Sequence, residues 1–134
     1  MKKIMCMGTF DILHPGHLDY FRQAKEYGDY LIVVVSRDAN VLKDKGRLPR
    51  FGEQERYARV AAQSIVDKAV LGNEDDKLKI VEQERPDILC LGYDQAVDET
   101  RLKEALAKRG FKPAIVRAKA YHPEKYKSSL LQQI

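Results

Sequence analysis

Short apolar runs alternate with amphipathic stretches along the whole chain. The run from Tyr30 to Ser36 is continuous and rich in β-branched residues, which is typical of a strand that is covered on both faces. Four other segments have a similar character. The pattern therefore predicts five buried strands, at Ile4–Met7, Tyr30–Ser36, Asp67–Leu71, Asp87–Gly92 and Pro113–Val116.

The segments between these strands have helical spacing. Leu18, Phe21 and Ala24 recur at the helical period before Gly28, and Asp98 and Gly110 are suitable capping residues at the ends of another helix. We expect helices from Pro15 to about Gly28 and at Gly52–Ser64, Glu74–Glu84, Glu99–Arg109 and Tyr126–Ile134. Residues 37–42 are expected to form a short helix or loop. Residues 43–50, which are basic and contain Gly46 and Pro49, are expected to form a mobile loop.

Strands that alternate with helices predict an α/β fold, a Rossmann-like, doubly wound parallel sheet with helices on both faces. No linker or repeat divides residues 1–134, so we expect a single domain. In open parallel sheets, ligands bind beyond the carboxyl ends of the strands, where the strand order reverses. Ser36, Gly92 and the residues after Val116 are expected to lie along that edge.

The composition narrows the class of partner. The formal charge of +4, from 24 basic and 20 acidic residues, suits an anionic ligand but is weak evidence for nucleic acid. No apolar run approaches the length of a membrane span, so we expect a cytoplasmic protein without a membrane partner. Cys6 and Cys90 lie in apolar strands and are expected to be buried, reduced thiols.

The most unusual residues follow the first strand, at Gly8–His17. Here His14 and His17 enclose Pro15 and Gly16 at a predicted helix start. Proline suits the first turn of a helix, and glycine leaves the backbone accessible to a ligand. A helix N-terminus with two imidazoles can bind phosphate. The alternative is that one histidine caps the helix while the other is solvated.

The rest of the sequence restricts the reaction. It shows neither a nucleophilic serine or cysteine with a nearby base nor a Gly-Lys-Ser/Thr phosphate loop. A phosphate site without a protein nucleophile favours nucleotidyl transfer, because the phosphate of the acceptor can attack directly. Such a reaction mainly requires positioning and charge neutralisation.

Gly-Thr-Phe-Asp at positions 8–11, followed by His-Pro-Gly-His at 14–17, resembles the signature of the cytidylyltransferase-like nucleotidyltransferases. Within that family the chain is most similar to archaeal-type FAD synthases, which transfer AMP from ATP to FMN. Glycerol-3-phosphate cytidylyltransferases, which use CTP, are the next most similar group. The resemblance implies a homodimer that binds ATP and FMN.

The resemblance also assigns residues to the nucleotide. His14 and His17 would contact its phosphates and stabilise the charge that develops during transfer. Lys45, or secondarily Lys43, would reach the phosphates from the basic loop. Further nucleotide contacts are expected from the backbone or side chains of Thr9, Phe10, Pro15 and Gly16.

Later segments complete the predicted site. Asp94, in Gly92-Tyr93-Asp94-Gln95, would accept hydrogen bonds from the ribose or base, and Tyr121 would lie at the nucleotide. Ser128 and Ser129 would start the last helix, with hydroxyl and N–H groups available to phosphate. The insertion after Arg117 departs from the cytidylyltransferase pattern and argues against direct phosphate contact by that residue.

Arg56 matches a family position, but the residue pattern also allows an ion pair on the surface of a helix. We expect Mg²⁺ or another divalent cation to accompany ATP, held by phosphates and waters and not by a protein metal site. The remaining alternative is a non-catalytic module that binds nucleotide or RNA. The intact histidine pair and the lack of aromatic residues on a basic strand argue against it, so no nucleic-acid partner is expected.

Overall fold

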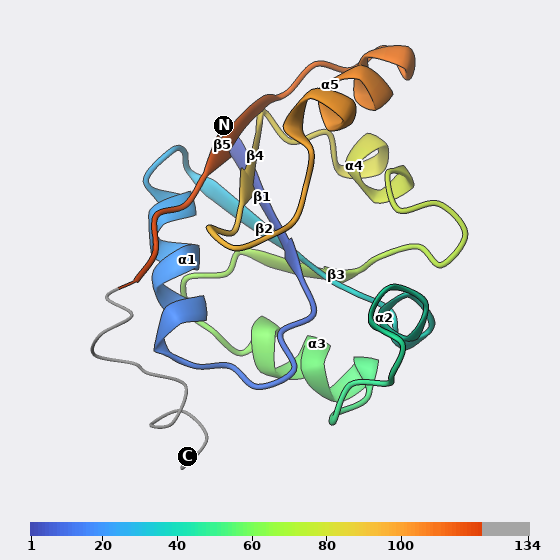
Figure 1. Ribbon diagram of the computed structural model, residues 1–134. Helices are drawn as coiled ribbons and strands as arrows, with labels where there is room; N and C mark the ends of the chain where they lie inside the picture. The colour runs from blue at the N-terminus through green and yellow to red at the C-terminus, as the bar shows by residue number, and fades with distance from the viewer. Residues whose placement is uncertain (122–134) are drawn as a thin grey trace.

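The computed structural model describes residues 1–121, which form one parallel sheet with helices on both faces (Figure 1). The strand order is β3-β2-β1-β4-β5, and every neighbouring pair is parallel. The strands are β1 Lys3–Gly8, β2 Tyr30–Val35, β3 Lys68–Leu71, β4 Ile88–Leu91 and β5 Ala114–Arg117. All five predicted strands are therefore present, and the prediction of an α/β, doubly wound fold is confirmed.

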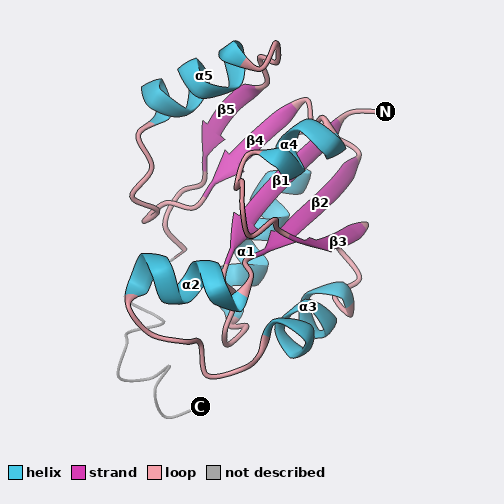
Figure 2. Ribbon diagram, turned by 90° about the vertical axis from the view of Figure 1, so that its right-hand side faces the viewer, coloured by secondary structure: helices cyan, strands magenta, loops and turns pink. Residues whose placement is uncertain are grey.

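Two apolar clusters bury the two faces of the sheet. The helices are α1 Pro15–Lys25, α2 Asp38–Lys45, α3 Glu53–Ala61, α4 Lys79–Glu84 and α5 Glu99–Lys108. One cluster joins α1 and α3 to the sheet through Phe21 and Val60, and the other joins α4 and α5 through Val81 and Leu106. Figure 2 shows α4 in front of the sheet and α1 behind it.

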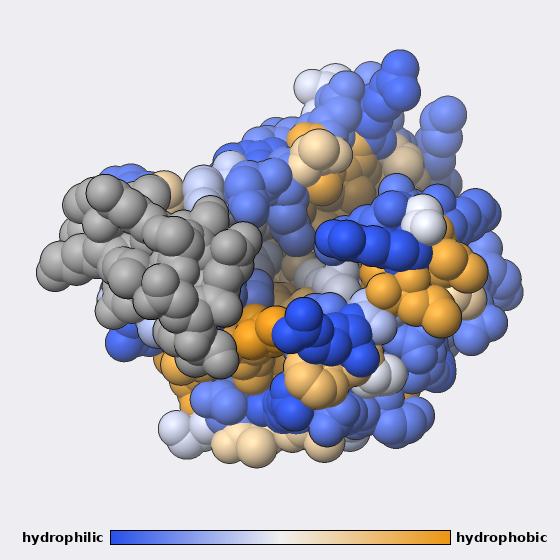
Figure 3. Space-filling model, turned by 60° about the horizontal axis from the view of Figure 1, so that its bottom comes forward, coloured by the Kyte–Doolittle hydropathy of each residue, from blue (hydrophilic) through white to orange (hydrophobic). Residues whose placement is uncertain are grey.

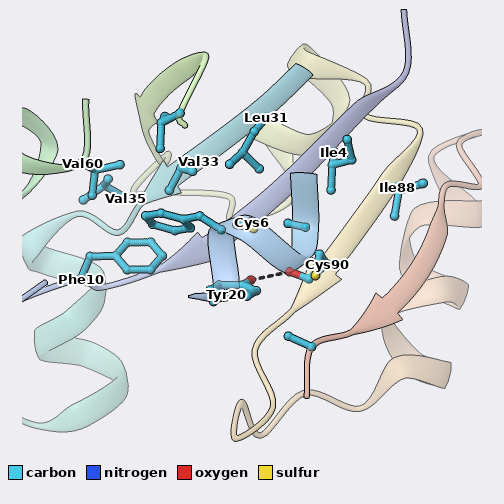
Figure 4. Close-up of a cluster of buried hydrophobic side chains, with 14 residues drawn as sticks. Ile4, Cys6, Phe10, Tyr20, Leu31, Val33, Val35, Val60, Ile88 and Cys90 are labelled. Atoms are coloured by element: carbon cyan, nitrogen blue, oxygen red, sulfur yellow. Dashed lines mark hydrogen bonds between the residues drawn. The ribbon is translucent and has the colours of Figure 1, made fainter. Parts of the chain in front are cut away.

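Side chains of each central strand alternate between these clusters. Ile4 and Cys6 of β1 belong to the α1 cluster, whereas Met5 between them belongs to the α4 cluster. Cys6 and Cys90 are in register on β1 and β4, and both are free and buried, as predicted. Tyr20 packs on this cluster and donates its hydroxyl to the backbone carbonyl of Cys90 (Figure 4).

Two predicted boundaries are wrong. The expected loop at residues 43–50 begins instead at Gly46, because α2 continues to Lys45 and Gly46 ends it in the left-handed conformation, with a φ of 77°. The helix expected from Glu74 begins only at Lys79. Its first residues are diverted because the Asp76 carboxylate accepts a hydrogen bond from the Leu78 backbone, a local contact that competes with helix formation.

The chain reverses direction across the sheet between β1 and β4. The first three strands proceed outward from β1 on one side, and β4 and β5 lie on the other. The carboxyl ends of β1 and β4 are therefore adjacent at the reversal point, with the loops of this edge at the bottom of Figure 1. No helix within residues 1–121 is both long and apolar enough to cross a membrane. The predicted helix at Tyr126–Ile134 lies outside the described residues.

Candidate functional site

The turn from β1 to α1 lies at this reversal point. Phe10 adopts a φ of 51° there, and its ring is buried edge-on against the rings of His17 and Phe21. Gly8 makes room for that ring, because a Cβ at position 8 would lie 2.7 Å from Phe10 Cζ. This burial leaves the backbone of Phe10, and not its ring, to make the predicted nucleotide contact. The ring packs beneath the turn, because burying a phenyl group in the core is more favourable than leaving it in water.

His14 forms the N-cap of α1. Its Nδ1 accepts a hydrogen bond from the Gly16 N–H at 3.1 Å, and Pro15 occupies the first helical position. An acceptor Nδ1 places the proton of the neutral ring on Nε2, which is then a donor. Gly16 is required for a reason that the sequence did not indicate, because a Cβ there would lie 2.8 Å from His14 Cε1.

The two histidine rings stack, with centroids 3.8 Å apart and an angle of 25° between their planes. Burial, together with the neighbouring His14, lowers the pKa of His17 to about 4, and a backbone contact with Ile12 only partly opposes this. Burial also lowers the pKa of His14, while the charge of Asp94 acts in the opposite direction. Both rings are therefore neutral near pH 7 in the free protein. The alternative is correct that one histidine caps the helix, since His14 is the N-cap, but it is wrong that the other is solvated, since His17 is half-buried and stacks on His14.

A cation faces this turn from α2. Lys45 Nζ lies 3.2 Å from the hydroxyl of Thr9 and is otherwise exposed. The last turn of a helix suits a lysine, because the negative end of the helix dipole attracts a cation. Lys45 thus lies beside the histidine motif, at the end of a helix and not in the expected loop, and its contact with phosphate stays a prediction. Lys43 is exposed on the same helix, and within residues 1–121 no hydrogen bond or ion pair joins it to the motif.

The side chain of Arg56 is fully buried beneath the site and forms hydrogen bonds to three other residues. Its guanidinium donates to the carbonyl of Thr9 at 2.8 Å and to that of Phe51 at 2.9 Å, and it pairs with Asp38 at 2.7 Å. The alternative of a surface ion pair is wrong. The helical pattern missed this role because an arginine on the buried face of a helix is unusual unless it is fully paired.

The loop after β4 carries Asp94 and is held in place by two side chains. Gln95 accepts from the Gly92 N–H at 2.8 Å and donates to the Met7 carbonyl at 2.7 Å, which links the ends of β4 and β1. Arg117 donates to the carbonyls of Gly92 and Gln95, each at 2.9 Å. Asp94 itself is exposed and close enough to His14 to affect its pKa.

Arg117 is therefore occupied by its own loop. It also pairs with Glu99 at 3.1 Å and donates to the Val97 carbonyl at 3.2 Å. These contacts agree with the prediction that Arg117 makes no direct phosphate contact. Neither Gln95 nor Arg117 gave a signal in the sequence for this positioning role, because each acts on backbone groups that only the folded chain brings together.

Of the nucleotide-contacting residues predicted after β5, only Tyr121 belongs to the described part of the chain. Tyr121 lies beside α1, where it lines a pocket of about 360 Å³ together with Tyr27 and Lys119. Gln23 holds this segment by accepting from the Lys119 N–H at 2.9 Å and donating to its carbonyl at 3.0 Å. The predicted phosphate-binding residues Ser128 and Ser129 lie outside the described residues.

Asp11 has a structural role. Its carboxylate accepts hydrogen bonds from the backbone N–H groups of Arg50, at 2.7 Å, and Phe51, at 2.9 Å. Within residues 1–121, no group of three or more histidine, cysteine or acidic side chains is arranged to hold a metal ion. What the described site offers is neutral imidazole, an ammonium group and the positive end of the α1 dipole, a combination suited to phosphate.

Comparisons with known proteins agree with this chemistry. The model of a family described as cytidylyltransferase-like matches residues 5–134. An FAD synthase of Ferroglobus placidus is 48% identical over 120 residues, covering 90% of this chain and 78% of the relative. An FAD synthase of Methanobrevibacter smithii is 49% identical over 133 residues, covering 96% and 86%.

Solved structures show the same fold. The crystal structure of a lipopolysaccharide core biosynthesis protein from Thermoplasma volcanium GSS1 has a TM-score of 0.86 and 43% identity, and the match covers 90% of this chain and 98% of the other. A pantoate-beta-alanine ligase from Francisella tularensis has a TM-score of 0.65 and 17% identity, with coverage of 87% and 58%. At that identity, the second likeness concerns the fold alone.

Proposed function

The chain belongs to the cytidylyltransferase-like family, and we propose that it is an FAD synthase, which transfers AMP from ATP to FMN and releases pyrophosphate. The observation that carries this proposal is its identity of 41–49% with curated archaeal FAD synthases over most of their length. The chain is a nucleotidyltransferase by the same evidence and by its family model. The geometry at the β1–β4 reversal point supports this activity.

In the proposed reaction, an oxygen of the FMN phosphate attacks the α-phosphorus of ATP. A new P–O bond forms as the bond between the α-phosphorus and the bridging oxygen breaks, and the electron pair leaves with pyrophosphate. A single in-line displacement inverts the configuration at phosphorus. The protein therefore has to align the two substrates and stabilise charge on the phosphoryl oxygens.

The charge is stabilised by groups of two kinds. His14 presents its Nε2–H as a neutral donor because its Nδ1 is engaged by the Gly16 N–H. His17 stacks on that ring, and its lowered pKa argues against a role as a general acid. Lys45, beside Thr9, supplies the positive charge. ATP would bind as its complex with Mg²⁺ or another divalent cation, which phosphate oxygens and waters coordinate.

We assign the nucleoside to the β4 side of the site. Asp94 is exposed there beside His14, and its carboxylate suits the donors of the ribose or base. Ser128 and Ser129 are proposed to contact the phosphates, and Tyr121 the nucleotide. The family resemblance is the support for these three assignments. It also suggests a homodimer, which light scattering of the purified protein would test.

One incubation tests the activity. The pure protein is mixed with Mg²⁺, with either ATP or CTP, and with either FMN or glycerol 3-phosphate, and the products are separated by chromatography. FAD formed only from ATP and FMN is the expected result. CDP-glycerol from CTP would show instead that the chain is a glycerol-3-phosphate cytidylyltransferase. RNA binding without release of pyrophosphate would favour the non-catalytic alternative.

A further inference from the structure

Exposed apolar side chains gather at the edge of the sheet that carries the site. Seven large hydrophobic side chains of the described residues are exposed, and only Met1 and Tyr27 lie outside the loops and helix that follow the strands at this edge. Figure 3 looks toward this edge and shows hydrophobic surface between hydrophilic regions. The other five are Ile12, Leu42, Leu48, Tyr93 and Val97.

Two of these side chains belong to segments that are hydrogen-bonded to each other. Leu48 is 61% exposed, and it lies between Lys45, which bonds to Thr9, and Arg50, whose backbone bonds to Asp11. Ile12 directly follows Asp11 and is 48% exposed. The loop at residues 46–51 is thus anchored near both ends to the turn that carries the histidines, and the exposed Leu48 lies between the two anchors.

The charges of this loop define the ligand further. Arg47 and Arg50 flank Leu48 and are exposed, and Lys45 precedes them beside the phosphate site. An apolar side chain among cations suits a ligand that combines a flat apolar body with an anionic group. A small polyol phosphate would leave Ile12 and Leu48 in water. FMN has both parts, an isoalloxazine ring and a phosphate.

We infer that Ile12 and Leu48 form the wall against which the isoalloxazine ring of the acceptor packs, with its phosphate directed toward Lys45. This inference rests on the proposed function. It places the acceptor on the α2 side of the histidines, because the β4 side carries Asp94 and is assigned to the nucleoside. Tyr93, which adjoins Asp94, then belongs to the nucleotide side and not to the flavin.

Steady-state kinetics of Leu48→Ala and Ile12→Ala test the inference. Each loses part of an apolar contact with the ring, and we expect the KM for FMN to rise about fivefold while the KM for ATP stays within about twofold. Leu48→Met keeps an apolar side chain of similar size and is expected to restore the KM for FMN. Leu42→Ala is the matched control, because Leu42 is also exposed, at 46%, but lies on α2 outside the proposed wall.

Lumiflavin, which carries the isoalloxazine ring with a methyl group in place of the ribityl phosphate, isolates the ring contact. It is expected to compete with FMN in the wild type and to inhibit Leu48→Ala about fivefold more weakly. A KM for FMN within twofold of wild type in both alanine variants would overturn the inference. It would also be overturned if the substitutions changed only the oligomeric state, as measured by size-exclusion chromatography. If the wild type forms no FAD, the proposed function itself fails, so the two failures are distinguishable.

Discussion

His14 combines a structural and a chemical role in one imidazole. Its Nδ1 caps α1, and its Nε2–H is free to meet phosphate. Asparagine is a good N-cap but cannot place a donor where Nε2 lies. We expect His14→Asn to retain its melting temperature within about 3 °C while turnover falls about 100-fold, the cost of losing one donor to a developing charge. Turnover within threefold of wild type would exclude His14 from the chemistry.

His17 makes stability depend on pH. The pKa of His17 is about 4 in the folded protein, below the ordinary value of 6.5, so between these pH values the unfolded chain binds more protons at this site. The contribution of the neutral His17 ring to the free energy of unfolding is therefore complete above pH 6.5 and is lost as pH falls toward 4.

We therefore expect the wild type to lose on the order of 2 kcal/mol more than His17→Gln between pH 7 and pH 4.5. Urea denaturation at the two pH values measures the free energy of unfolding of both proteins. If the free energy of unfolding changed equally with pH in the wild type and in His17→Gln, the fold would not be holding His17 neutral.

At the scale of elements, Arg56 joins α3 to the turn after β1 and to α2. Lysine retains the charge and has three donors, but its compact ammonium group cannot span the two carbonyls and the carboxylate as the planar guanidinium does. We expect Arg56→Lys to lower the free energy of unfolding by about 3 kcal/mol, because buried carbonyls and Asp38 lose their partner, and to lower kcat/KM as the turn loosens. Arg59→Lys is the control from the exposed face of α3, where a change of less than about 0.5 kcal/mol is expected. Equal effects of the two substitutions would contradict this account.

Gln95 acts between two strand ends. Gln95→Glu retains an acceptor for the Gly92 N–H but places a carboxylate against the carbonyl of Met7. The loop that carries Asp94 should then shift away from β1. We expect the KM for ATP to rise about fivefold with the KM for FMN unchanged, a free-energy cost of about 1 kcal/mol. An equal rise in both KM values would assign Gln95 to general stability.

For the whole molecule, binding of the correct nucleotide stabilises the folded state. At a free MgATP concentration 100 times the Kd, we expect a gain of about 2.7 kcal/mol in the free energy of unfolding, measured as a rise in melting temperature. MgCTP at the same concentration should give a smaller rise, and His14→Asn should reduce the effect of MgATP. A larger effect of MgCTP would point to a cytidylyltransferase.

The sequence by itself determined the type of fold and the type of reaction. A parallel sheet buried on both faces requires continuous apolar strands, so runs such as Leu31–Val35 identify it without any tertiary information. The histidine motif is equally local, because a helix start needs only neighbouring residues to form a phosphate site. The roles of Lys45 and Asp94 at the nucleotide rest on the family resemblance and stay predictions.

Only the tertiary structure decided how the site is supported. Arg56 and Gln95 bond to backbone groups 47 and 88 residues away, and no local pattern specifies such partners. The burial of Phe10 and the space that Gly16 leaves for His14 depend on packing at van der Waals distance. The anchoring of the loop that carries Leu48 was likewise invisible in the sequence, because it depends on hydrogen bonds from Arg50 and Phe51 to Asp11, 39 and 40 residues away.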